Sequence, residues 1–340
     1  MSGLPSAPDA ALPTFVIEMG PRDPAKRLAV VIYNPTAGSG LGKRTVDLTD
    51  VRARFAAHGW QAGTLATRQA GDGEAAARYA LGQGAAMVVA MGGDGTINEV
   101  VQALANQDVP LGIIPTGTIN ILAREMGLPL EPLDTVEALA TGEPRTIDLG
   151  IANGRFFTSM IGLGYDAEST MNLIPQLKAW SGPLAYWVSA FRSYLRHKAV
   201  RATLRIHDGT RVRRLRRLVY LMVVSNAGLY AGGVLKFTPE ASMADGLLDA
   251  CVIRSGRWYR ALFHGALTFL GRLRTVSDVE FFRATEIEFT TSRPFPYQLD
   301  GDPVGHTPVR IAIAANALRV IGPATRATMA ADAPPAAPPV

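Results

Sequence analysis

Residues 87–99 read MVVAMGGDGTINE, and this stretch decides how the rest of the chain is interpreted. Its five apolar residues, 87–91, predict a buried strand, and the pattern from residue 97 onward predicts a helix. Three glycines in the turn between them remove Cβ atoms that would keep a ligand away from the backbone. A helix that starts after such a turn directs free N–H groups and the positive end of its dipole at the ligand, which suits a phosphate group.

A purely structural interpretation of this turn also exists. Thr96 and Glu99 have the spacing of a capping box, which serves only to start a helix. That interpretation explains Thr96 and Glu99, but it leaves three glycines around the carboxylate of Asp94 without a purpose. We therefore favour a phosphate-binding turn.

Two further turns follow apolar runs in the same way. Residues 34–40, NPTAGSG, follow a predicted strand over 28–33, and residues 115–120, PTGTIN, follow one over 111–114. The first turn matches neither the Walker A loop nor the dinucleotide-binding pattern, and a structural role is an equally good account of it. In the second, Thr118 and Asn120 are small polar residues that can reach a nucleotide. Because the carboxyl ends of parallel strands lie at one edge of a sheet, the three turns together predict a phosphate-lined crevice.

The segment from residue 28 to about 145 alternates between short apolar runs and helical patterns. This alternation predicts an N-terminal Rossmann-like parallel α/β domain. Its predicted strands are 28–33, 65–67, 87–91 and 111–114, and its predicted helices are 44–58, 72–83, 97–106, 119–126 and 135–140.

The pattern changes near residue 146, where a hairpin signal around Asn153-Gly154 joins runs 147–152 and 156–160. Strand-like runs recur at 200–207, 217–224, 247–253, 284–290 and 309–313, with helical stretches at 183–196 and 257–274. We expect an antiparallel β-sandwich here. The predicted organisation is a flexible tail over 1–27, an α/β domain over 28–146, a β-rich domain over 147–323 and a Pro/Ala-rich tail over 324–340. The cleft between two such domains is the default place for a ligand.

Composition limits the class of protein. The chain has 340 residues, 48% of them apolar and 19% charged, which is typical of globular domains. There is no run of eighteen apolar residues and no signal-peptide pattern, so we expect a cytoplasmic protein. A single cysteine, Cys251, excludes an internal disulfide and every multi-cysteine metal site.

The net charge is +5, and arginines crowd between Arg192 and Arg217. Nucleic acid, nucleotide phosphates or an anionic membrane could attract such a cluster, but a solvated strand is the simpler interpretation. The apolar segment 183–196 has interfacial aromatics and basic residues at its end. It suits a membrane-surface helix or a lid, although a core-packing helix is the preferred interpretation.

The motifs, taken in order, resemble the diacylglycerol kinase catalytic-domain family, which includes bacterial lipid kinases and the sphingosine and ceramide kinases. The resemblance rests on Asn34-Pro35-x-x-Gly38, on Gly92–Glu99 and on Gly117-Thr118-x-Asn120-x-x-Ala123-Arg124. It continues through residues 147–150, 162–167, 230–233, 239–246 and 299–302, and so covers roughly 28–322. The GGDGT sequence alone also occurs in NAD kinases, whereas the whole ordered set is highly specific.

The resemblance implies an ATP- and Mg²⁺-dependent kinase that transfers the γ-phosphoryl group to a hydroxyl of diacylglycerol or a related lipid. It implies an ATP site lined by Asn34, Pro35, Thr36, Ala37, Gly38, Thr67, Gly93, Asp94, Gly95, Thr96, Ile97, Asn98, Glu99 and Thr118. Two roles remain open for Asp94, which are to hold Mg²⁺ or to orient the attacking hydroxyl. Asp302 corresponds to the family's proton acceptor, which is usually Glu, although Asp300-Gly301 by itself indicates only a hairpin.

The resemblance also implies a second, structural Mg²⁺ held by Asp245 with the backbone carbonyls of Ser242 and Leu247. Asp245-Gly246 is equally well explained as a turn. Two positions depart from the family pattern. Ile121 stands where many bacterial relatives carry Asp, and Ser39 stands where Lys often follows the glycine, so the lipid substrate stays open.

The partner expected from the resemblance is a lipid substrate at the inner membrane surface, which the chain visits as a peripheral protein. We expect no nucleic-acid partner, and the sequence leaves open whether the chain forms a homodimer. Two alternative functions remain. One is an NAD kinase-like enzyme, and the other is a non-catalytic lipid- or nucleotide-binding regulator, which the departures at Ile121, Ser39 and Asp302 would explain.

Overall fold

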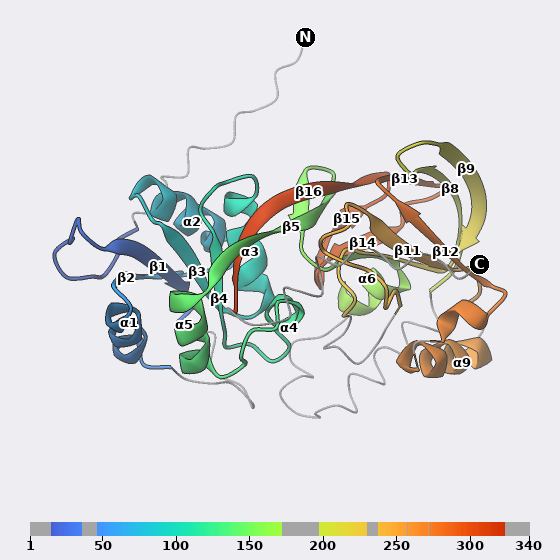
Figure 1. Ribbon diagram of the computed structural model, residues 1–340. Coiled ribbons are helices and arrows are strands. Elements are labelled where there is room, and N and C mark those ends of the chain that lie inside the picture. The colour runs from blue at the N-terminus through green and yellow to red at the C-terminus, as the bar shows by residue number, and fades with distance from the viewer. Residues whose placement is uncertain are drawn as a thin grey trace, which may run out of the picture.

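Two β-sheets organise the chain in the computed structural model, which describes residues 15–35, 46–171, 197–229, 237–256, 258–270 and 272–323 (Figure 1). In the described residues the larger sheet has ten strands, with the order β2-β1-β3-β4-β16-β13-β8-β9 and with β5 and β6 branching from β16. The smaller sheet has six strands in the order β12-β11-β10-β7-β14-β15.

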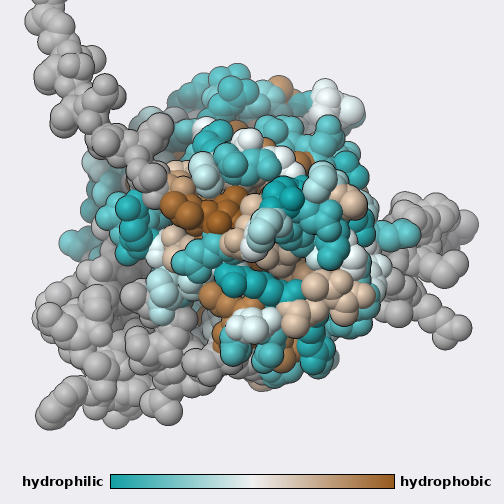
Figure 2. Space-filling view, turned by 90° about the vertical axis from the view of Figure 1, so that its left-hand side faces the viewer, coloured by the Kyte–Doolittle hydropathy of each residue, from teal (hydrophilic) through white to brown (hydrophobic). Residues whose placement is uncertain are grey.

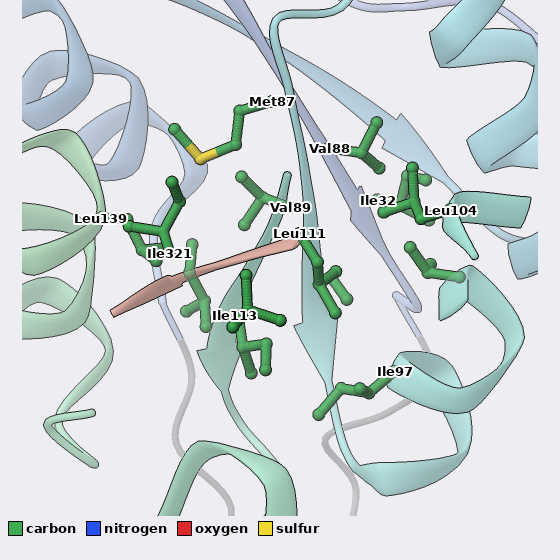
Figure 3. Close-up of a cluster of buried hydrophobic side chains, with 14 of the residues drawn as sticks. Ile32, Met87, Val88, Val89, Ile97, Leu104, Leu111, Ile113, Leu139 and Ile321 are labelled. Atoms are coloured by element: carbon green, nitrogen blue, oxygen red, sulfur yellow. The ribbon is translucent and has the colours of Figure 1, made fainter. Parts of the chain in front are cut away.

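The N-terminal half is built on four parallel strands that the apolar runs predicted. These are β1 (Arg27–Tyr33), β2 (Trp60–Ala66), β3 (Met87–Gly92) and β4 (Leu111–Pro115). Helices cover both faces of this part of the sheet, and the strands are therefore apolar on both sides. The helices are α1 (Leu48–Ala57) and α5 (Pro132–Thr141) on one face, and α2 (Asp72–Gly82) and α3 (Asp94–Leu104) on the other. Figure 3 shows Val88 and Val89 of β3 pointing to opposite sides of the sheet.

The strand order places a switch point at β1. From β1 the chain passes through α1 to β2 on one side, whereas from β3 it passes through α3 to β4 on the other side. The two crossovers leave the carboxyl ends of β1 and β3 in opposite directions, which opens a crevice there. The turns that follow β1 and β3 are among those that the sequence predicts to contact a phosphate.

The C-terminal half is an antiparallel β-sandwich. One layer is formed by β5 (Glu143–Ala152), β6 (Arg155–Phe157), β8 (Val200–His207), β9 (Val212–Val219), β13 (Glu286–Thr291) and β16 (Val309–Gly322). The other is formed by β7 (Met160–Gly164), β10 (Leu221–Ser225), β11 (Leu248–Ile253), β12 (Val279–Ala284), β14 (Pro296–Leu299) and β15 (Asp302–His306). Phe289 and Leu204 from the first layer and Leu163 and Leu299 from the second share one buried core.

Helices cover the outer face of the smaller sheet. They are α6 (Tyr165–Met171), α9 (Trp258–Phe269) and the short 3-10 helix η2 (Leu273–Thr275). No described helix is long and apolar enough to span a bilayer.

Strand β16 connects the two halves. Its first residues pair with β13 and with β5, while Val320 at its other end pairs with Leu111 of β4 in parallel. Val320 and Ile321 are buried in the N-terminal core, where Figure 3 shows Ile321 beside Leu139 of α5. The last strand of the chain thus completes the first core, and the division of the chain near residue 146 stays a prediction.

The structure confirms the fold class and most predicted elements, with shifted ends. Helix α3 starts at Asp94 rather than at residue 97, because Gly93 adopts an extended N-cap conformation and Asp94–Thr96 form the first helical turn. Helix α5 starts at Pro132 rather than at 135, since proline is favoured in the first turn. Strand β2 begins at Trp60 rather than at 65.

Other sequence predictions have mixed outcomes. The hairpin at Asn153-Gly154 is confirmed, with φ angles of 47° and 88° that fit a type I′ turn. The single strands predicted over 217–224 and 284–290 are each the end of one strand and the start of the next, joined at Tyr220 and Thr285. The helix predicted over 183–196 lies outside the described residues.

Candidate active site at the carboxyl edge of the parallel strands

The loops that follow the four parallel strands lie at the same edge of the sheet. Asn34 and Pro35 follow β1, whereas Thr36, Ala37 and Gly38 lie outside the described residues. Thr67 follows β2, and its backbone N–H donates to the Tyr33 carbonyl at 2.8 Å, which ties the ends of β1 and β2 together. The Thr67 side chain is buried, and its hydroxyl donates to the same Tyr33 carbonyl at 3.4 Å.

The turns after β3 and β4 are pressed against each other. The Thr116 N–H donates to the Gly92 carbonyl at 3.1 Å. A Cβ atom on Gly117 would lie 2.6 Å from the Gly93 Cα, so only glycine allows this approach. Packing thus explains Gly117, and it explains Gly92 as well, because a Cβ there would lie 2.6 Å from the Thr96 Cβ.

Gly95 is different, because the fold gives no reason for a glycine there. A Cβ on Gly95 would meet no atom within 4 Å, and its φ angle is not in the left-handed region. The residue is exposed in the first turn of α3, a helix whose N-terminus has no side-chain cap. Open space beside uncapped helical N–H groups is the arrangement that binds a phosphate.

Asp94 joins these two turns. Its carboxylate accepts hydrogen bonds from the backbone N–H groups of Ile121, at 2.7 Å, and Asn120, at 3.1 Å, at the start of α4 (Ile121–Glu125). Burial raises the pKa of Asp94, and the two N–H donors and the Arg124 charge oppose that shift. A carboxylate has about four acceptor positions, so Asp94 can hold the turns together and still accept a substrate hydroxyl or a cation.

Glu99 does not form the capping box that its spacing allowed. Its two carboxylate oxygens accept from the N–H groups of Gly71, at 2.7 Å, and Gly73, at 2.8 Å, at the start of α2. The structural interpretation of the Thr96–Glu99 pair is therefore wrong. Glu99 instead positions the loop after β2 against α3.

Three other residues of the predicted nucleotide site differ in environment. Asn98 is 2% exposed, and neither polar atom of its side chain has a hydrogen-bond partner. Buried amides are nearly always hydrogen-bonded, so a ligand or an ordered water is needed here. The Ile97 side chain is 1% exposed and packs in the core, so only its backbone can face a ligand (Figure 3). Thr118, by contrast, is exposed at the rim.

The turn between β14 and β15 carries Asp300 and Asp302 in different settings. Asp300 accepts from the backbone N–H groups of Thr158, Ser159 and Met160 at 2.7–2.9 Å, and from the Thr158 hydroxyl at 3.0 Å. Burial raises the pKa of Asp300, and these four donors oppose the shift. Asp300 therefore anchors the turn to the start of β7. Its role could not be assigned from the sequence, where it read only as part of a hairpin.

Asp302 starts β15 and is exposed. Desolvation of its carboxyl raises the pKa of Asp302, and the positive charge of Arg155 opposes the shift. Arg155 precedes Phe156, whose backbone exchanges two hydrogen bonds with the Gln102 amide of α3, at 2.9 and 3.0 Å. The helix that begins at Asp94 thus contacts the hairpin whose arginine faces Asp302.

The predicted second metal site has a different occupant. The Asp245 carboxylate accepts from the Leu247 N–H at 3.1 Å and forms an ion pair with Arg283, whose Nε also lies 3.3 Å from Asp249. The Ser242 hydroxyl accepts from the Ala244 N–H at 3.3 Å. The single positive charge of Arg283 offsets only part of the charge of the two carboxylates, but the guanidinium lies against Asp245, and these side chains so arranged do not fit Mg²⁺. We derive no step through a metal at this position.

Comparisons with known proteins agree with this architecture. Residues 28–152 match the family model described as diacylglycerol kinase catalytic domain, and residues 159–322 match the one described as YegS C-terminal NAD kinase beta sandwich-like domain. A Bacillus subtilis (strain 168) protein named diacylglycerol kinase is 29% identical, over 89% of this chain and 99% of its own length. A Chromohalobacter salexigens protein named "Probable lipid kinase YegS-like" is 31% identical, over 83% of this chain and 92% of its own.

Solved structures show the same fold. A crystal structure from Bacillus anthracis str. Sterne covers 89% of this chain and 99% of its own, with a TM-score of 0.71 at 23% identity. A second one, titled as a diacylglycerol kinase from the same organism, has the same coverage with a TM-score of 0.64 at 20% identity.

Proposed function

The chain belongs to the diacylglycerol kinase catalytic-domain family, and from this premise we propose that it transfers the γ-phosphoryl group of ATP to a hydroxyl of diacylglycerol or a related lipid. The observation that carries the proposal is the uncapped start of α3. There Gly95 leaves open space that packing does not require, and the nearby Asn98 amide is buried without a partner.

In this proposal the four loops bind ATP. The N–H groups of the first turn of α3 hold a phosphate, the residues after β1 and Thr67 complete the crevice, and Asn98 contributes its unsatisfied amide. Thr118 and Asn34 line the rim. Glu99 acts indirectly, because both of its carboxylate oxygens hold the loop before α2.

Catalysis in this reaction class depends on positioning and on charge neutralisation more than on covalent chemistry. Mg²⁺ bound with the nucleotide would supply part of that neutralisation, and Asp94 has the spare acceptor positions to hold it. The same carboxylate keeps the turns after β3 and β4 together, so it fixes where the phosphates lie. Asp302 accepts the proton of the lipid hydroxyl, because it is an exposed carboxylate on a turn that Asp300 anchors rigidly.

An NAD kinase activity is the second candidate, and one specific observation favours it. The model matched by residues 159–322 is described as NAD kinase beta sandwich-like. The same crevice can hold ATP in either enzyme, so the acceptor substrate distinguishes them.

A transfer assay with labelled ATP tests both. The purified protein is given Mg²⁺ and, in separate reactions, liposomes with diacylglycerol, monoacylglycerol, ceramide, a sphingoid base or phosphatidylglycerol, or NAD⁺ in solution. We expect product with a lipid, and a loss of about a hundredfold or more in Asp94→Ala and in Asp302→Ala. Asp134→Ala, which removes an exposed carboxylate on α5, is the matched control and keeps full activity.

The outcomes separate the hypotheses. Phosphorylation of NAD⁺ without any lipid product would show that the protein is an NAD kinase and not a lipid kinase. ATP binding without turnover on any acceptor would support the non-catalytic regulator. Association with the inner membrane surface as a peripheral protein belongs to the same proposal.

A further inference from the structure

We propose that α9 and the adjoining cation-lined hollow form a docking surface for an anionic phospholipid bilayer. This inference rests on the proposed function and deepens it, because it assigns the membrane contact to named residues, and its test needs neither ATP nor turnover. The surface lies at the end of the molecule opposite β2 and away from the crevice (Figure 1).

The first observation is an apolar stripe on α9 that faces solvent. Phe263 is 54% exposed and Phe269 62%, and Leu270, just after the helix, is 61% exposed. Helical spacing of three to four residues puts these positions, with exposed Ala266, on one side. The opposite side is committed to the fold, since His264 is 5% exposed and its Nε2 lies 3.2 Å from Asp278.

Phe263 and Phe269 are the two aromatic residues among the exposed large hydrophobic residues of the part of the chain that the structure describes. By comparison, Figure 2 shows the β2 end of the molecule, where hydrophobic residues lie in separate patches between hydrophilic ones. A helix whose inner face is packed and whose outer face is apolar needs a non-aqueous partner outside the molecule.

The second observation is the hollow beside the stripe, with a volume of about 860 Å³. Five cationic side chains line it, namely Lys198, Arg216, Arg217, Arg254 and Arg260, and Arg260 belongs to α9 itself. Two carboxylates offset them. Asp278 pairs with Arg260, and Glu280 pairs with Arg217 and Arg254. The hollow therefore keeps an excess of positive charge.

Two of the cations are incompletely paired. Arg216 is exposed and has no acidic partner among the residues that the structure describes. The Nε of Arg254 is buried and has no hydrogen-bond partner. A neighbouring hollow of about 630 Å³ shares Arg216, Arg217 and half-exposed Leu218, so positive charge and apolar surface continue side by side along β9.

An anionic bilayer is the partner that satisfies both features at once. Its phosphates complement the arginines, and its interfacial hydrocarbon accepts the phenylalanines. Nucleic acid would satisfy only the charge. A second copy of the chain related by two-fold symmetry would bring two positively charged hollows together, which is unfavourable.

The test measures sedimentation of the full chain with vesicles of phosphatidylcholine alone or with phosphatidylglycerol added. We expect strong binding only to the anionic vesicles, weakened by salt. Arg216→Ala combined with Arg254→Ala should reduce that binding by at least about tenfold, since each basic residue near such a surface contributes about 1 kcal/mol. Phe263→Ser combined with Phe269→Ser should reduce it by about tenfold or more through lost apolar burial.

Matched controls come from the opposite end of the molecule. Arg78→Ala removes an exposed arginine of α2, and Val16→Ser removes a valine that is 68% exposed, and both should bind like the unaltered chain. Thermal melting and phosphoryl transfer to lipid in detergent micelles check that each variant is folded and that the crevice is intact. A failure of docking is thereby distinguished from a failure of the proposed function.

Vesicle binding by both double variants that equals the controls would overturn the proposal. So would a phenylalanine variant that binds vesicles normally but changes the mass in sedimentation velocity, because the stripe would then be a contact between copies. Preferential loss of nucleic-acid binding in the arginine variant, with vesicle binding unchanged, would likewise overturn it.

Discussion

Four aspartates of this protein have different roles because their carboxylates have different partners. Asp94 bonds the N–H groups of a neighbouring turn, Asp300 is enclosed by four donors, Asp245 pairs with an arginine, and Asp302 is exposed. Their neighbours in space come from segments far away in the chain. Two predictions belong to this scale.

Arg283 should serve as an internal cation for Asp245 and Asp249. The Asp249 side chain is 3% exposed, its burial raises the pKa of its carboxyl, and the Arg283 charge opposes that shift. Arg283→Met should lower the free energy of unfolding by about 1–3 kcal/mol, because it leaves a carboxylate pair with no cation, although Arg283 is itself half-exposed.

The decisive measurement is thermal melting with Mg²⁺ or with a chelator. The unaltered chain should melt at the same temperature in both, whereas Arg283→Met should be stabilised by Mg²⁺. Arg310→Met, which removes a surface ion pair with Glu286, should cost less than about 1 kcal/mol and show no Mg²⁺ effect. A chelator effect on the unaltered chain would mean that Asp245 binds a cation after all.

Asp302 should set the acid limb of the pH profile. A base works only when deprotonated, so kcat/KM should be present above the pKa of Asp302 and be lost as the pH falls through it. Desolvation raises that pKa above the ordinary value for aspartate, and Arg155 lowers it. Arg155→Ala should therefore move the acid limb to higher pH, while Arg213→Ala, on the exposed edge of β9, should not. An unmoved limb in Arg155→Ala would contradict the assignment of Asp302.

At the scale of elements, the site is an arrangement of loop ends on a rigid sheet. The switch point at β1 brings the turns after β1 and β3 together, and the Gly93–Gly117 contact adds the turn after β4. The glycines in these turns are needed for different reasons, and substitution by alanine can distinguish packing from ligand binding.

Gly95→Ala should leave folding intact and impair nucleotide binding. No atom lies near the added methyl, and alanine is favoured over glycine in a helix by up to about 1 kcal/mol, so stability should be unchanged or higher. The methyl would occupy the space for the phosphate, so KM for ATP should rise at least about tenfold.

Gly117→Ala is the comparison variant, because there the methyl would meet backbone at 2.6 Å and should cost about 1–3 kcal/mol of stability. Melting curves and ATP titrations on both variants give the result. Normal ATP affinity in Gly95→Ala would contradict the proposal that a phosphate binds at the start of α3.

At the scale of the whole molecule, strand β16 connects the two hydrophobic cores. It pairs with β5 along most of its length, and its end supplies Leu318, Val320 and Ile321 to the N-terminal core. The Ala317 carbonyl also accepts from the Asn106 N–H at 2.6 Å, just after α3.

A chain that stops after residue 315 should therefore lose its cooperative melting transition. Each buried Leu, Val or Ile contributes about 1.5–3 kcal/mol, and a domain has only about 5–15 kcal/mol in total. Circular dichroism during heating measures this, and a chain that stops after residue 323 is the control, expected to melt like the full chain. A cooperative transition in the shorter chain would show that the N-terminal core folds without β16.

The sequence by itself determined the fold class, the hairpin at Asn153-Gly154 and the turns that lie together at one edge of the parallel strands. These follow from local rules: apolar runs make buried strands, a switch between periodicities separates the layers, and glycine-rich turns after strands lie at one sheet edge. The predicted ends of strands and helices were less accurate. Helix α3 begins directly after its N-cap Gly93 and helix α5 begins at Pro132, in both cases earlier than the apolar pattern indicates.

Only the tertiary structure decided which side chains meet. That Glu99 caps α2, that Asp300 anchors the turn beside Asp302 and that Arg283 faces Asp245 all depend on residues 26 to 142 positions apart. No spacing along the chain encodes such pairs, because they arise when separate elements pack. The pairing of β16 with β4 also could not be predicted from spacing along the chain. It forms because the end of β16 packs into the same core as β4.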